Sequence, residues 1–76
     1  MRERILEIFS RIMETPVESL TADSSTATVE AWDSLKHMNL VLALEEEFGI
    51  RLTDDQIMKM VTVGAIVGTV TELAPA

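Results

Sequence analysis

The stretch EAWDSLKHMNLVLALEEEFGI, Glu30 to Ile50, decides the fold. It is the longest apolar segment of the chain, and its apolar residues recur at the three- and four-residue spacing of an amphipathic helix. Asp33 stands where a carboxylate can cap the start of a helix, and Gly49 stands where a glycine commonly ends one. The stretch therefore predicts a helix that begins at Ser34 and ends before Gly49.

Two apolar strips run along this helix when successive residues are placed about 100° apart around its axis. The predicted core strip consists of Leu40, Val41, Leu44 and Phe48. The second strip lies on a largely opposite side and consists of Leu35, Met38 and Leu42. One helix of a small bundle cannot bury both strips. Two interpretations stay open: Leu35 and Leu42 pack beneath a loop, or the strip contacts a partner protein.

Three further helices are predicted around this one. Residues 3–13 carry apolar side chains at i, i+4, i+7 and i+8, and Pro16 ends that helix. Thr53 and Gln56 form a capping box that opens a helix of one or two turns. The apolar residues after Thr62 recur at helical spacing and also alternate as in a strand. A lone strand would find no pairing partner in the chain, so we predict a fourth helix capped by Thr62.

A long loop without periodicity, residues 17–32, connects the first two helices. Val17, Leu20 and Val29 are the apolar side chains that could anchor it. The sequence thus predicts an all-α four-helix bundle with a short third helix, formed by residues 1–76 as a single domain. The predicted core converges from three helices and consists of Phe9, Leu40, Leu44, Phe48, Ile66 and Val70.

The composition excludes several classes of function. Thirteen acidic and six basic side chains give a net charge of −7, which disfavours nucleic acid and favours basic patches on other proteins. The absence of cysteine excludes disulfides and thiolate metal sites. No metal-ligand spacing is present, and no apolar run approaches the ~18 residues of a membrane span. We expect a cytoplasmic, monomeric protein that binds other proteins and does not insert into membranes.

Three consecutive glutamates, Glu45, Glu46 and Glu47, occupy the last turn of the central helix. The helix dipole makes carboxylates unfavourable there by ~0.3–1 kcal/mol each. They therefore do not stabilise the helix. They are either a solvated face or a landing site for Lys and Arg side chains of partner proteins.

Ser34 is not an activated nucleophile. The chain lacks the G-x-S-x-G motif, and its one histidine, His37, has no third group to orient it. We predict that His37 is a partly packed side chain and not a catalytic residue. A phosphoryl group attached to Ser34 would face free N–H groups and the positive end of the helix dipole. The alternative is that Ser34 is a second capping residue beside Asp33.

The triplet Asp33-Ser34-Leu35 followed by LVLALEEEFGI resembles the acyl carrier protein family. Thr53-Asp54-Asp55 and Thr62-Val63-Gly64, which open the third and fourth helices, fit the same pattern. The resemblance implies that Ser34 carries 4′-phosphopantetheine, transferred from coenzyme A by a magnesium-dependent phosphopantetheinyl transferase. The thiol of this arm would hold acyl groups as thioesters and present them to enzymes of fatty-acid, lipid or polyketide-type biosynthesis. The resemblance also implies that the carrier itself catalyses nothing and is not an enzyme.

The resemblance also implies roles for the neighbours of Ser34. Asp33 would help to present the serine, and Leu35 would pack against the arm or enter a pocket of the partner. The implied surface for acyl-loading and acyl-using enzymes consists of Leu35, Met38, Leu42, Glu45, Glu46 and Glu47.

Three residues depart from the pattern of fatty-acid-synthase carriers. Trp32 replaces a small or flexible residue, and Lys36 and Asn39 replace residues that are usually acidic. The diluted acidic face predicts a specialised, discrete carrier that serves a dedicated pathway. Two other functions stay open: a peptidyl or aminoacyl carrier, and a small helical adaptor without a prosthetic group in which Ser34 only caps the helix.

Overall fold

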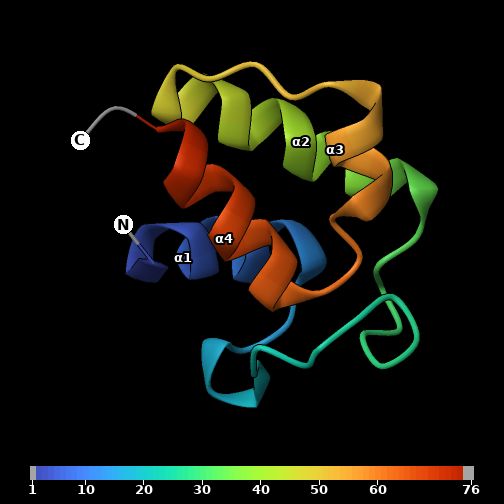
Figure 1. The fold of residues 1–76 in the computed structure, drawn as a ribbon. Coiled ribbons are helices and arrows are strands. Elements are labelled where there is room, and N and C mark those ends of the chain that lie inside the picture. Colours follow the sequence, from blue (N-terminus) through green and yellow to red (C-terminus); the bar gives the residue numbers. More distant parts are fainter. Residues whose placement is uncertain (1, 75–76) are drawn as a thin grey trace.

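A computed structural model describes residues 2–74, which form four α-helices and one short 3-10 helix (Figure 1). Their bounds are α1 (Arg2–Met13), η1 (Val17–Ser19), α2 (Ser34–Phe48), α3 (Asp54–Lys59) and α4 (Val63–Leu73). The all-α architecture, the short third helix and the long loop before α2 are as predicted. The sequence did not predict η1, which is a single turn within that loop.

Local capping explains where α2 begins and ends. The Asp33 carboxylate accepts a hydrogen bond of 2.8 Å from the backbone N–H of Lys36. At the other end, Gly49 has φ 63° and ψ 39°, and its N–H donates to the carbonyl of Glu45. Glycine adopts this left-handed conformation without the steric cost of a side chain. Both predicted ends of α2 are confirmed.

Capping also explains α3 and α4. The Thr53 hydroxyl accepts from the backbone N–H of Gln56 at 3.1 Å, while the Gln56 side chain accepts from the N–H of Thr53 at 2.9 Å. This reciprocal pair is the predicted capping box. The Thr62 hydroxyl accepts from the N–H of Ala65 at 3.0 Å, so the fourth segment is a helix, as predicted.

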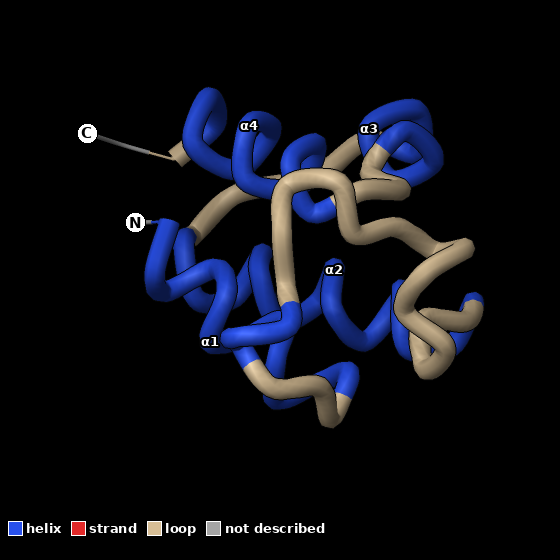
Figure 2. Tube along the Cα trace, turned by 90° about the horizontal axis from the view of Figure 1, so that it is seen from below, coloured by secondary structure: helices blue, strands red, loops and turns tan. Residues whose placement is uncertain are grey.

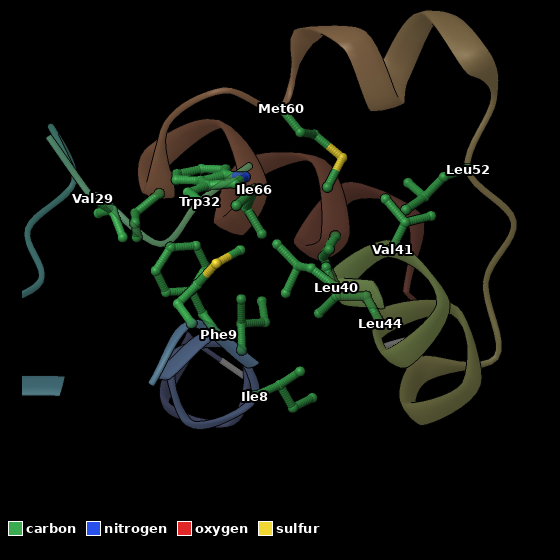
Figure 3. Close-up of a cluster of buried hydrophobic side chains, with 14 of the residues drawn as sticks. Ile8, Phe9, Val29, Trp32, Leu40, Val41, Leu44, Leu52, Met60 and Ile66 are labelled. Atoms are coloured by element: carbon green, nitrogen blue, oxygen red, sulfur yellow. The ribbon is translucent and has the colours of Figure 1, made fainter. Parts of the chain in front are cut away.

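One core connects the four helices (Figure 3). Five predicted core residues are at most 1% exposed: Phe9, Leu40, Leu44, Ile66 and Val70. Phe48, the sixth predicted core residue, packs against the core but is only partly buried. Trp32 was not predicted to be buried, but it is 4% exposed.

The loop before α2 lies against the start of α4. The Val63 N–H donates to the carbonyl of Ser24 at 2.8 Å, and the Gly64 N–H donates to that of Ala22 at 2.9 Å. A Cβ at Gly64 would lie 3.1 Å from the Ala22 oxygen, so the backbones could approach this closely with a larger residue only if the loop shifted by a few tenths of an ångström. The loop is thereby held along α4 by its own backbone.

Two of the three predicted loop anchors are confirmed. Val29 is buried and Leu20 packs partly against the core, whereas Val17 is 39% exposed and anchors nothing. In Figure 2 the tan loop runs from the end of α1 to the start of α2, and α3 lies at the edge of the bundle.

Candidate functional site

Ser34 is the first residue of α2, and its side chain is exposed. Within residues 2–74 its hydroxyl makes no hydrogen bond, since the carboxylate of Asp33 provides the cap. The backbone N–H groups of Ser34 and Leu35 have no partner in the same part of the chain. An anionic group attached to the Ser34 oxygen would therefore meet free N–H donors at the positive end of the helix dipole.

His37 lies one turn beyond Ser34 and is partly buried, as predicted. Its Nδ1 lies 2.9 Å from the indole Nε1 of Trp32, and its Nε2 lies 2.9 Å from the carbonyl oxygen of Ile57. Both ring nitrogens are thus occupied by structural hydrogen bonds. The described residues give His37 no arrangement in which it could take a proton from Ser34.

An apolar groove with a volume of about 520 Å³ opens beside Ser34, between α2 and α3. It is lined by Thr26, Trp32, Asp33, Ser34, His37, Met38, Ile57, Met58 and Val61. The side chains of α3 form its wall opposite α2. The sequence did not indicate this groove, because its lining residues come from two separate stretches of the chain, 26–38 and 57–61.

The second apolar strip of α2 faces solvent. Leu35 is 71% exposed, Met38 46% and Leu42 60%. The interpretation that Leu35 and Leu42 pack beneath the loop is wrong, because the loop lies against α4 instead. Met58 of α3, 76% exposed, and Val61, 44% exposed, are further apolar residues on the surface. Together we call Leu35, Met38, Leu42, Met58 and Val61 the apolar face.

The three consecutive glutamates have three different environments. The Glu45 carboxylate is partly buried and accepts a hydrogen bond of 2.8 Å from the backbone N–H of Leu52. The Glu47 carboxylate accepts hydrogen bonds of 3.0 and 3.1 Å from the guanidinium of Arg4. These hydrogen bonds, together with the charge of Arg4, hold the pKa of Glu47 below its ordinary value. Glu46 is exposed and makes no ion pair or hydrogen bond within residues 2–74.

Lys36 turns away from the apolar face and toward the end of α1. Its Nζ donates to the carbonyl of Ile12 at 3.1 Å and lies 3.3 Å from the carboxylate of Glu14. Glu14 has a φ of 53°, which is uncommon for a residue other than glycine. Lys36 therefore places a cation at the C-terminal end of a helix, where the dipole favours it. The sequence did not indicate this packing role of Lys36. Asn39, the other residue that departs from the family pattern on α2, is exposed.

Residues 2–74 contain no group of three or more His, Asp and Glu side chains arranged to hold a metal ion. In the same part of the chain, no helix has both the length and the apolar character needed to cross a bilayer.

Comparison with known proteins identifies the class of protein to which the chain belongs. A family model described as "Phosphopantetheine attachment site" matches residues 3–70. The chain is 38% identical to the acyl carrier protein of Helicobacter acinonychis (strain Sheeba) over 69 residues, covering 82% of this chain and 88% of the relative. The corresponding identity with the acyl carrier protein of Helicobacter pylori (strain G27) is 36% over 69 residues, with the same coverage of each chain.

Solved structures agree with these relatives. The solution structure of holo acyl carrier protein from Geobacter metallireducens aligns with a TM-score of 0.84 and 29% identity, covering 95% of this chain and 83% of that one. A putative acyl carrier protein from Mycobacterium tuberculosis also aligns with a TM-score of 0.84, at 30% identity, covering 93% of this chain and 95% of that one.

These matches define a protein that bears a prosthetic group and is not an enzyme. The chain belongs to the acyl carrier protein family. It carries 4′-phosphopantetheine covalently, and its partners are a phosphopantetheinyl transferase and acyl-handling enzymes.

Proposed function

We propose that Ser34 is the attachment site of the 4′-phosphopantetheine arm. The observation that carries the proposal is the exposed Ser34 hydroxyl at the start of α2, beside two backbone N–H groups that have no partner among residues 2–74. In the transfer the Ser34 oxygen bonds to the phosphorus of the pantetheine phosphate, its proton leaves with a base, and 3′,5′-adenosine diphosphate departs from coenzyme A. Asp33 fixes the serine at the helix start by capping α2, and Leu35 lies exposed beside it.

The cargo that fits this site is an acyl group held as a thioester on the arm. The groove beside Ser34 is lined mainly by apolar side chains, and burial of an alkyl chain there is favourable by ~0.8 kcal/mol per CH₂ group. This lining favours acyl over aminoacyl or peptidyl cargo. We propose that the protein serves fatty-acid, lipid or polyketide-type biosynthesis; the name of its relatives, acyl carrier protein, supports the acyl cargo.

The proposed unit of function is one domain spanning residues 1–76. Its support is the single core, to which all four helices contribute buried side chains or partly buried ones. The exposed Asn39 and the inward-turned Lys36 leave the start of α2 with less negative charge than a fatty-acid-synthase carrier offers. We therefore propose a discrete carrier that serves a dedicated pathway.

Incubation of the unmodified protein with coenzyme A, Mg²⁺ and a phosphopantetheinyl transferase tests the proposal. Intact mass spectrometry is expected to show complete conversion to a species heavier by one phosphopantetheine group. A helical adaptor in which Ser34 only caps the helix would keep its original mass.

The proposed surface for partner enzymes combines Leu35, Met38 and Leu42 with the glutamates at the end of α2. Among Glu45, Glu46 and Glu47, Glu46 is the one without a protein partner in the described chain, so it is the carboxylate most available to a basic side chain. Glu45 already holds the N–H of Leu52, and its reversal to Lys would remove that acceptor. Charge reversal is therefore expected to be harmless to the fold at Glu46 and harmful at Glu45.

Glu46→Lys is expected to lower the association rate with the transferase by ~3–10-fold at low salt, with the difference shrinking as salt rises. Its thermal stability should stay equal or rise slightly, because a cation suits the end of a helix. Stopped-flow titrations at low and high salt measure the effect, and Asp23→Lys, in the exposed loop, is the matched control. Equal low-salt rates for Glu46→Lys and wild type would show that Glu46 is only a solvated charge.

A further inference from the structure

Two consecutive hydrogen bonds connect the start of α2 to α3. The indole N–H of Trp32 donates to Nδ1 of His37, and Nε2 of His37 bonds the carbonyl oxygen of Ile57, each over 2.9 Å. An indole N–H can only donate and a carbonyl oxygen can only accept. Both contacts are therefore satisfied when Nδ1 of His37 accepts from Trp32 and Nε2–H donates to Ile57. A single tautomer satisfies both contacts.

Trp32, the first residue of this hydrogen-bond series, is firmly held. Trp32 is 4% exposed, and its ring meets that of Phe9 edge-on with centroids 4.9 Å apart. The imidazole of His37 lies nearly parallel to the indole, at a centroid distance of 5.9 Å and an interplanar angle of 26°. Figure 3 shows Trp32 within the core cluster above Phe9. The orientation of His37 is thus set by a side chain that cannot easily move.

Ile57, the last residue of this hydrogen-bond series, belongs to α3, and other contacts hold α3 only weakly. α3 has six residues, none of them fully buried, and helices of this length are not stable on their own. Ile57 packs only partly against the core, and the buried Met60 follows the helix as its C-cap. The bond from His37 to Ile57 is therefore a substantial part of what fixes α3 against α2.

We propose that His37 is a positioning residue: it holds α3 in place beside Ser34, and Trp32 in turn holds His37. The consequence is that the groove and the apolar face, which α2 and α3 build jointly, are preformed before a partner arrives. A preformed surface binds more tightly because no ordering cost is added on association. This role rests on the proposed function in one respect, namely that partners approach the surface around Ser34.

Two amide substitutions separate the bonds of His37. In His37→Asn the short side chain places its amide near the position of Nδ1, where it can accept from Trp32 but cannot reach Ile57. In His37→Gln the longer side chain places its amide near Nε2 and can still donate to Ile57. Asn39→Ala, on the exposed surface of α2, is the control for a change in the helix alone.

Amide hydrogen exchange of the unmodified protein measures how firmly α3 is held in each variant. The measurement does not depend on the phosphopantetheine arm. In His37→Asn the backbone amides of Ile57 and Met60 are expected to exchange roughly tenfold faster, the effect of one lost hydrogen bond, while α1 amides are unchanged. In His37→Gln and Asn39→Ala the α3 amides should stay within about twofold of wild type, which is the scatter of small surface effects.

Three results would overturn the proposal. They are unchanged α3 exchange in His37→Asn, an equal acceleration in α1 and α3, and a His37→Gln variant that behaves like His37→Asn.

A second readout is the transferase reaction. In this reaction His37→Asn should raise KM by about fivefold to tenfold with little change in kcat, because the loosened surface must be ordered on binding. A loss in kcat alone would contradict this. If Ser34 proved not to be the attachment site, the exchange result would still stand by itself.

Discussion

Replacement of Ser34 by alanine is expected to abolish the mass increase that the transferase produces, while the fold stays intact. In the proposed attachment the Ser34 hydroxyl supplies the oxygen that bonds the arm, and this hydroxyl has no hydrogen bond to lose within the described residues. Asp33 continues to cap α2, and alanine is favourable inside a helix. The free energy of unfolding should therefore change by less than about 1 kcal/mol. Intact mass and thermal unfolding followed by circular dichroism measure the two effects.

Ser19→Ala is the matched control, because Ser19 is also exposed but lies in η1. It is expected to be modified to the same extent as wild type. A mass increase on Ser34→Ala would place the arm elsewhere. A large fall in melting temperature of that variant would instead give Ser34 a structural role.

Truncation of Leu44 to alanine is expected to cost ~2–5 kcal/mol, enough to unfold much of a domain this small. Leu44 is fully buried, so the substitution removes apolar contacts and leaves a cavity among side chains of the core. Leu42, two residues away on the same helix, is 60% exposed. Leu42→Ala is expected to change stability by less than about 0.5 kcal/mol, since a surface position leaves no cavity.

Urea denaturation of both variants measures this difference. The two substitutions remove the same atoms from the same helix, so differences in helix propensity cancel. A loss of stability for Leu42→Ala as large as that for Leu44→Ala would mean that the apolar face is covered by the protein itself. That result would remove the main support for a partner-facing role of Leu42.

The helix ends could be predicted because each one is fixed by a local capping interaction. Asp33, Gly49 and Thr53 act on backbone groups no more than four residues away, so their meaning is contained in short stretches of sequence. The core strip of α2 was predictable for the same reason, because its periodicity is local.

The contacts around the site could not be predicted because they join distant parts of the chain. Lys36 reaches a carbonyl 24 residues earlier, and His37 reaches one 20 residues later. Trp32 ends a loop that has no periodicity, so no pattern indicated its burial. In the sequence Glu45 and Glu46 are equivalent charges. In the structure the chain turns back after α2, and the backbone N–H of Leu52 donates to the carboxylate of Glu45.

The buried position of Trp32 has an optical consequence. The chain contains one tryptophan and no tyrosine, so fluorescence excited in the indole absorption band would come from a single side chain. That indole lines the groove beside Ser34 and is hydrogen-bonded to His37. Its emission wavelength responds to the polarity around the ring and to the loss of the hydrogen bond. If the proposed acyl cargo enters the groove, the protein contains its own spectroscopic reporter of loading and needs no attached dye.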